Sequence, residues 1–204
     1  MGKIVVIGVG PGSEEYLTPI AKEAVKEAEV LIGGRRQLSL FPDKKPRIEI
    51  GKDLDGVLKF IRENQDKKIA VLTSGDPGFY SILGRLLENF PREDIEIIPG
   101  ISSMQLCFAK AKMMWHDAEF ISLHGRETEG LIEKAKNSRK LAILTDKRMP
   151  PNSIADMLIE EGITGRRVVV CEGLTQTTER VEESTLKEIS KKSFSGNCVM
   201  VIYR

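Results

Sequence analysis

Residues 3–13 read KIVVIGVGPGS, and this stretch decides the fold class. Residues 3–7 are mostly β-branched and run into a glycine, which is typical of a strand buried on both faces of a parallel sheet. The glycine-rich turn at residues 8–12 is followed by Thr18 and Pro19, which suit an N-cap and the first position of a helix. A buried strand, a glycine turn and a helix are the opening of a strand–helix–strand unit.

The same alternation of strand and helix continues outward from this stretch through the first half of the chain. Strands are predicted at residues 30–32, 47–50, 68–73 and 95–98, and helices at residues 18–29, after Asp53, at residues 79–88 and from Ser102. Such alternation predicts a mostly parallel sheet with helices on its faces. Glycine-rich turns follow three of the strands, at residues 8–12, 74–78 and 99–103, and ligands of parallel sheets gather at the carboxyl ends of strands.

The second half of the chain has a different pattern. Residues 112–117 interrupt the alternation, and we expect them to join an N-terminal lobe, residues 1–112, to a C-terminal lobe, residues 118–204. The predicted strands of the second lobe are residues 119–123, 141–144, 166–170 and 198–203, with helices at 128–136 and 153–161. The polar segment 171–180 suits a hairpin. The sequence therefore predicts an α/β fold of two lobes, with a mostly parallel N-terminal sheet, a mixed C-terminal sheet and flanking helices.

The composition sets limits on function. The 204 residues are 41% hydrophobic and 30% charged, which is normal for a soluble globular chain. A net charge of +1 gives no strong field for nucleic acid or an anionic membrane. Short apolar runs and the absence of a signal peptide predict a cytoplasmic protein. Three widely spaced cysteines, Cys107, Cys171 and Cys198, predict buried free thiols and neither a disulfide framework nor a zinc site.

The first glycine turn invites comparison with a dinucleotide site, because residues 8–13 read GVGPGS and nearly match GxGxxG. The last glycine comes one residue early, however, and Pro11 has no backbone N–H to donate to a phosphate. The helix begins only near Thr18, so its N-terminus cannot lie directly under a pyrophosphate. An NAD or FAD site is therefore disfavoured. A hydrolase triad is also disfavoured, because there is no GxSxG motif and the histidines are only His116 and His124.

The three turns taken together resemble those of one family. IGVGPGSEEYLTPIAKEAVKEAEVLIGG, VLTSGDPGFYSILGRL and IPGISS occur in this order at residues 7–34, 71–86 and 98–103. In order and spacing they resemble the tetrapyrrole methylases, which transfer a methyl group from S-adenosylmethionine to a macrocycle carbon. In the second half, EGLTQTTER and NCVMV, at residues 172–180 and 197–201, are compatible with the polar loop and the closing strand of that family.

The resemblance implies a two-lobed fold with both ligands in the cleft between the lobes. S-adenosylmethionine, with S-adenosylhomocysteine as its product, would lie against the second and third turns and against loops of the second lobe. The implied cofactor residues are Pro11, Gly75, Asp76, Phe79, Ser102, Ser103, Thr145, Glu172, Leu174 and Val199. The implied substrate residues are Gly10, Pro11, Arg35 and Arg126, where arginine forks suit the carboxylates of the macrocycle. His124 is a candidate general base, and no protein-bound metal is implied.

Plainer interpretations of the same residues stay open. Asp76 stands between glycine and proline, which is also the sequence of an ordinary Asx turn. Ser102 and Ser103 suit a helix N-terminus, with or without a ligand. Arg35 and Arg126 have the alternative of being solvated surface side chains, and His124 that of being a turn residue.

Within the family, three details resemble the members that methylate carbon 5 of cobalt-precorrin-7 in cobalamin biosynthesis. These are GPGSEEYLTP at residues 10–19, GGRRQL at 33–38 and LHGR at 123–126. Such members imply a homodimer, and a separate decarboxylating carbon-15 methyltransferase as a possible partner. The alternatives of the same fold are another precorrin methylase, a uroporphyrinogen-III methylase, a diphthine synthase and a ribosomal RNA ribose methylase. A nicotinamide-dependent oxidoreductase and a non-catalytic adenosine-binding module are the alternatives from other classes.

Overall fold

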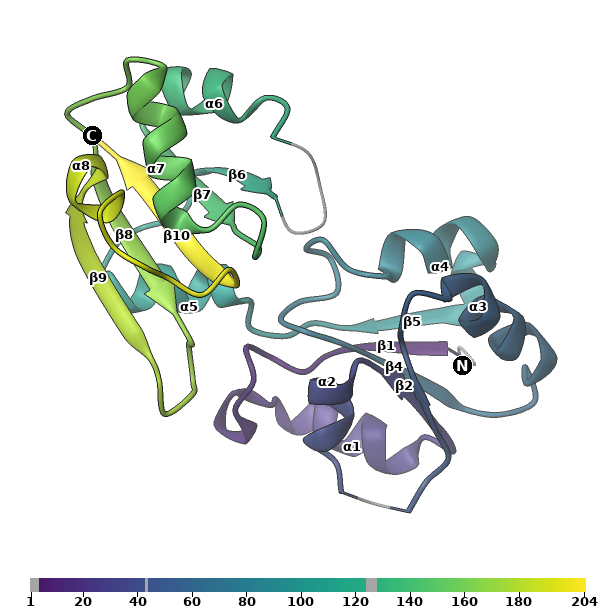
Figure 1. Ribbon diagram of the computed structural model, residues 1–204. Helices are drawn as coiled ribbons and strands as arrows, with labels where there is room; N and C mark the ends of the chain where they lie inside the picture. The colour runs from purple at the N-terminus through teal and green to yellow at the C-terminus, as the bar shows by residue number, and fades with distance from the viewer. Residues whose placement is uncertain (1–3, 43, 124–127) are drawn as a thin grey trace. The chain divides into compact units, whose positions relative to one another are not determined.

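The computed structural model describes residues 4–42, 44–123 and 128–204 (Figure 1). The chain forms two compact units, Met1–Ser102 and Ser103–Arg204. The division falls before the helix that begins at Ser103, whereas the lobe boundary expected from the sequence lies at residues 112–117. That helix contacts strand β10 of the second unit. Among the described residues, no helix is long and apolar enough to cross a membrane.

The first unit is built on a five-stranded sheet in which every pair of neighbours is parallel, as predicted. Its order is β3-β2-β4-β1-β5. The strands are β1 (Ile4–Gly8), β2 (Val30–Gly33), β3 (Arg47–Glu49), β4 (Ile69–Thr73) and β5 (Ile95–Ile98). The three glycine-rich turns follow β4, β1 and β5, which are neighbours, so the turns meet at one edge of the sheet.

Helices cover both faces of this sheet. They are α1 (Pro19–Glu27), α2 (Arg35–Ser39), α3 (Leu54–Glu63) and α4 (Leu83–Asn89), with short 3-10 helices η1 (Glu14–Tyr16) and η2 (Arg92–Asp94). The predicted caps are confirmed, because the Thr18 side chain accepts a hydrogen bond from the Ala21 amide and Asp53 accepts one from Gly56. The helix predicted at residues 79–88 begins only at Leu83, because a turn occupies the preceding residues and Tyr80 has a left-handed φ of 53°.

The second unit contains a mixed five-stranded sheet of order β6-β7-β10-β8-β9. Its strands are β6 (Glu119–Ser122), β7 (Lys140–Leu144), β8 (Arg167–Glu172), β9 (Arg180–Thr185) and β10 (Cys198–Tyr203). Strands β6 and β7 are parallel, and the other pairs are antiparallel. The hairpin expected after residue 171 is formed by β8 and β9. The predicted α/β class, with one parallel and one mixed sheet, is therefore confirmed.

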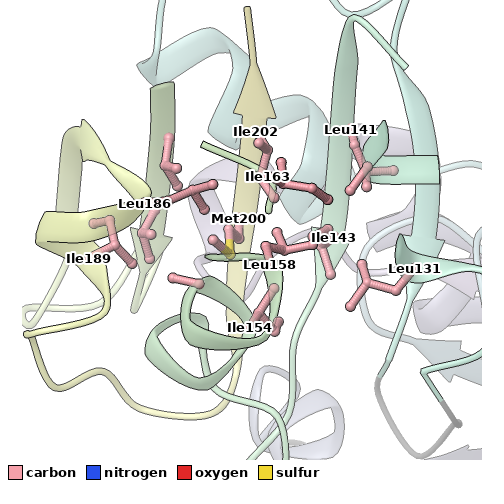
Figure 2. Packing of buried hydrophobic residues seen from close by; sticks show 14 of the residues in the cluster. Leu131, Leu141, Ile143, Ile154, Leu158, Ile163, Leu186, Ile189, Met200 and Ile202 are labelled. Atoms are coloured by element: carbon pink, nitrogen blue, oxygen red, sulfur yellow. The ribbon is translucent and has the colours of Figure 1, made fainter. Parts of the chain in front are cut away.

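Four helices pack on the second sheet: α5 (Ser103–Lys110), α6 (Leu131–Asn137), α7 (Pro151–Glu160) and α8 (Leu186–Ile189). Figure 2 shows the core between one face of the sheet and α6, α7 and α8, where Ile154 and Leu158 approach Ile143 and Met200. All four side chains are fully buried. Alternate residues of the strands point to the other face, and α5 lies against that face through its contacts with β10.

The cysteines differ from the prediction. Cys107 of α5 and Cys171 of β8 form a disulfide, with their Cα atoms 5.8 Å apart. The expectation of three free thiols was therefore wrong for two of them, because α5 crosses the face of the sheet on which Cys171 lies. These two residues are 64 positions apart in the chain. Cys198 is free and buried, and its burial raises the pKa of the thiol to about 11.

Candidate functional site

Three glycines bring the turns of the first unit into backbone contact. We call Gly8, Gly75 and Gly100 the glycine cluster. A Cβ atom on Gly8 would lie 2.6 Å from both the Gly100 nitrogen and the Gly75 carbonyl oxygen, and one on Gly100 would lie 2.3 Å from that oxygen. No side chain fits at such distances. The chain therefore needs glycine here so that three strand ends can converge.

Asp76 connects two of these turns through its carboxylate. One oxygen accepts a hydrogen bond from the Gly78 amide at 2.8 Å, and the other accepts one from the Gly100 amide at 3.1 Å. The first bond is the Asx turn that its sequence allowed, and the second reaches across to the turn after β5. Asp76 therefore holds the second and third turns together, whatever else it contacts.

The first turn is unsuited to a pyrophosphate. The Gly10 amide donates to the Gly75 carbonyl at 3.3 Å, and the Gly75 amide donates to the Gly10 carbonyl at 2.8 Å. Both amides are thus used within the protein, and Pro11 has none. Helix α1 begins at Pro19, after an intervening 3-10 helix. Gly10 and Pro11 therefore offer no free amide of the kind that a Rossmann loop directs at a dinucleotide.

The other residues predicted in the first unit lie at or near the same edge. Gly10 and Pro11 are buried, and Ser102 is buried directly before α5. Phe79 is half-buried and stacks edge-on against Tyr80, with ring centroids 4.8 Å apart. Arg35 begins α2, one residue after the end of β2, and its exposed guanidinium forms an ion pair with Glu49 at 3.4 Å.

The predicted cofactor residues of the second unit form a group of their own. Thr145 follows β7, Glu172 ends β8 and Val199 lies near the start of β10. We call these three the edge group. The Thr145 hydroxyl donates to the Gly196 carbonyl and accepts from the Cys198 amide at 3.0 Å. Glu172 accepts a hydrogen bond from the Ser195 amide. These polar side chains are therefore engaged with the chain segment that leads into β10.

The turn between β8 and β9 carries Leu174 and a strained neighbour. Leu174 is buried, and Thr175 has a φ of 68°, which is rare for a β-branched residue. The Thr175 hydroxyl is buried without a hydrogen-bond partner, while its amide donates to Glu179 at 2.8 Å. Lys110 and this amide hold the pKa of the Glu179 carboxyl below its usual range. Strain of this kind is found at functional sites.

Some predictions lie outside the described residues, namely His124 and Arg126. Ser103 is the first residue of α5. Within the ranges that the structure describes, no group of three His, Cys, Asp or Glu side chains is placed to hold a metal ion. Sequence reasoning missed the contact role of Gly8 and Gly100, although a glycine directly after a strand was the available signal.

Comparison with known proteins identifies a family, in agreement with the glycine turns on a parallel sheet. The profile of the family described as Tetrapyrrole (Corrin/Porphyrin) Methylases matches residues 3–190. The chain belongs to the tetrapyrrole methylase family, which confirms the resemblance inferred from the turns. Members of this family are S-adenosylmethionine-dependent methyltransferases.

Several relatives match nearly the whole chain, among them the following two. A cobalt-precorrin-7 C(5)-methyltransferase of Salmonella typhimurium is 36% identical over 200 residues, which are 98% of each chain. A probable cobalt-precorrin-7 C(5)-methyltransferase of Methanocaldococcus jannaschii is 39% identical over 209 residues, or 97% of this chain and 96% of the relative.

Solved structures of known proteins share the fold, and two of them illustrate it. A precorrin-6Y methylase of cobalamin biosynthesis from Archaeoglobus fulgidus is 29% identical, with a TM-score of 0.75 over 98% of this chain and 97% of its own. A uroporphyrin-III C-methyltransferase from Thermus thermophilus, complexed with S-adenosylhomocysteine, is 23% identical. Its TM-score is 0.76 over 99% of this chain and 92% of its own.

Proposed function

We propose that this protein transfers the methyl group of S-adenosylmethionine to carbon 5 of cobalt-precorrin-7 in cobalamin biosynthesis. The observation that carries the proposal is the similarity, over nearly the full length of both chains, to proteins of that name. The arrangement of the turns supports the cofactor. S-adenosylmethionine has no phosphate, so it does not need the amides that Gly10 and Gly75 use on each other.

The reaction asks little of acids and bases. S-adenosylmethionine supplies an electrophilic methyl group. When its carbon–sulfur bond breaks, a neutral thioether remains as the leaving group. The ring carbon is an electron-rich nucleophile that forms the new carbon–carbon bond, and the charge that passes to the ring is released as a proton. The protein has mainly to align the two reactants and exclude water. We assign alignment to the rigid backbone of the glycine cluster and to Asp76, and cofactor contacts to the edge group and Leu174. Cobalt enters as part of the substrate.

The remaining residue assignments follow from the same proposal. We propose that the cofactor is lined by Pro11, Phe79 and Ser102 of the first unit and by Ser103 of the second unit, and the macrocycle by Gly10, Pro11 and Arg35. The exposed Arg35 guanidinium forms an ion pair with Glu49, and its fork suits an acetate or propionate group of the substrate. Arg126 is proposed for the same role and His124 as a general base.

A thermal-shift experiment tests the cofactor. S-adenosylhomocysteine should raise the unfolding temperature, because a ligand that binds only the folded state stabilises it by mass action. NAD at the same concentration serves as the control, since an oxidoreductase that uses the first glycine turn would respond to NAD instead. Stabilisation by NAD alone would contradict the proposal.

The ring position needs a separate experiment. Anaerobic incubation with cobalt-precorrin-7 and S-adenosylmethionine should add one methyl group, seen by mass spectrometry and placed on carbon 5 by NMR. The other corrin precursors and uroporphyrinogen-III are the matched substrates. Methylation of one of these and not of cobalt-precorrin-7 would move the assignment to another member of the family.

We further propose a cytoplasmic homodimer. Met114 and Trp115 are large apolar side chains that stay 72% and 48% exposed, which supports a contact surface at this loop. Light scattering should give twice the chain mass, and Met114→Lys should lower it; an unchanged mass for this variant would exclude the loop. We also propose that a separate protein catalyses the decarboxylating methylation at carbon 15.

A further inference from the structure

A row of residues crosses the second sheet at the end where β7 and β8 finish. Arg180 of β9 is the register partner of Glu172 of β8, and Glu172 is the partner of Cys198 of β10. Val199 of β10 pairs with Leu144 of β7. Because these strands are antiparallel, Thr145 lies at the position that faces Cys198. Arg180 therefore stands at the outer end of a row that contains or adjoins every member of the edge group.

Arg180 makes more contacts than an ordinary surface arginine. Its Nη2 atom lies 3.3 Å from a Glu172 oxygen and donates to the Ser193 carbonyl at 3.1 Å. Its Nε lies 3.8 Å from Glu182, and its guanidinium carbon lies 4.4 Å from the centroid of the Phe194 ring. A planar fork is needed to reach a carboxylate and a carbonyl while stacking on an aromatic face.

These contacts converge on segment 193–198, which leads into β10. Arg180 holds Ser193 and Phe194, and Glu172 holds the Ser195 amide. Gly196 lies so close to the backbone of Lys147 that a Cβ atom would stand 2.2 Å from it. The Thr145 hydroxyl donates to the Gly196 carbonyl, so the segment is held from β8, from β9 and from the end of β7.

We propose that Arg180 is a positioning residue for cofactor binding. By fixing segment 193–198 and the Glu172 carboxylate, it determines the positions of Thr145, Glu172 and Val199. This inference rests on the proposed function, in which those three residues line S-adenosylmethionine. Arg180 itself, 44% exposed at its side chain, acts through its neighbours and not by touching the ligand.

The experiment compares Arg180→Ala with Arg167→Ala. Arg167 lies at the other end of β8 and forms an exposed ion pair with Glu183 at 2.7 Å. Arg167→Ala therefore removes a surface positive charge, as Arg180→Ala does, but leaves segment 193–198 untouched. Calorimetry should show S-adenosylhomocysteine binding to Arg180→Ala weakened roughly tenfold, and to Arg167→Ala unchanged. The KM for S-adenosylmethionine should rise with Arg180→Ala, while kcat at saturation stays within about threefold.

Two further measurements separate positioning from general loss of stability. Arg180→Lys keeps the charge without the fork, so it should weaken binding nearly as much as Arg180→Ala. Release of segment 193–198 should also expose the buried Cys198 thiol, so N-ethylmaleimide should label it faster in Arg180→Ala than in Arg167→Ala.

The outcomes decide between the proposals. Unchanged affinity in Arg180→Ala, or equal losses in Arg180→Ala and Arg167→Ala, would overturn the positioning role and leave the proposed function standing. Full rescue by lysine would also overturn it. If the wild-type protein bound no S-adenosylhomocysteine, the proposed function would fail, and this inference with it.

Discussion

The glycine cluster of the first unit and the edge group of the second unit both lie where strands of a sheet begin or end, but they are held in different ways. In the first unit, backbone packs on backbone, and Gly8 and Gly100 leave no room for a Cβ atom. In the second unit, the side chains of Thr145 and Glu172 hold segment 193–198, with one close backbone approach, that of Gly196 to Lys147. Backbone packing requires one residue type and so leaves a motif in the sequence, whereas side-chain networks depend on register and leave none.

The largest expected effect comes from filling the glycine cluster. Gly100→Ala places a Cβ atom 2.3 Å from the Gly75 carbonyl oxygen and 2.7 Å from the Gly8 backbone, so the strand ends must move apart. We expect a loss of about 4 kcal/mol in the free energy of unfolding, because backbone atoms cannot yield as side chains do. Urea unfolding measures it.

Gly84→Ala is the matched control, because among the described residues no atom outside the adjoining backbone of α4 lies within 4 Å of a Cβ at this position. It should leave stability unchanged or raise it by ~0.5 kcal/mol. Equal losses from the two variants would break the distinction between backbone packing and side-chain networks.

The second effect concerns the disulfide of the second unit. It joins α5 to the strand that ends at Glu172, so reduction should loosen the support of the edge group. Closing a loop of 64 residues between Cys107 and Cys171 should contribute about 3 kcal/mol of stability, which reduction removes. Thermal unfolding with and without dithiothreitol measures the difference.

The double variant Cys107→Ala/Cys171→Ala controls for other actions of the reductant. It should unfold at the same temperature with and without dithiothreitol. Thiol counting in denaturant should give one free thiol before reduction and three after it, because the chain has three cysteines. Three free thiols before reduction would show that the bridge does not form.

The third effect tests whether a side chain also matters in the first unit. Asp76→Asn leaves one acceptor oxygen where the carboxylate serves both the Gly78 and the Gly100 amides. An amide NH₂ would then face a backbone N–H, and we expect S-adenosylhomocysteine to bind about 1–2 kcal/mol more weakly. Calorimetry measures it, with Asp55→Asn as the control, since the Asp55 side chain is 89% exposed. Equal affinity in both variants would assign the alignment to glycine backbone alone.

The smallest effect is a pH dependence within the edge of the second unit. Burial raises the pKa of Cys198 from 9.0 to about 11, so the folded thiol keeps its proton where the unfolded one loses it. Its contribution to stability is therefore complete below pH 9.0 and declines as the pH rises toward about 11. Urea midpoints should fall more steeply in the wild type than in Cys198→Ala. Parallel slopes would contradict the assignment.

Particular residues show how far local sequence reaches. Thr18 and Asp53 correctly predicted the starts of their helices, because an N-cap hydrogen bond joins residues three positions apart. The start of α4 was misplaced, because residues 79–82 suit a helix locally while Tyr80 takes a left-handed conformation. The disulfide was missed, because nothing near Cys107 or Cys171 records that α5 lies across β8.

The sequence by itself determined the alternation of strands and helices, the three glycine turns and the family to which they belong. Each depends on residue type at short range or on a requirement for glycine, and both can be read directly from the sequence. Only the tertiary structure decided that Asp76 reaches Gly100, that Arg180 stands opposite Glu172, and that two of three cysteines are joined. Those relations arise from strand register and helix packing between distant segments, where many residue types satisfy the same local pattern.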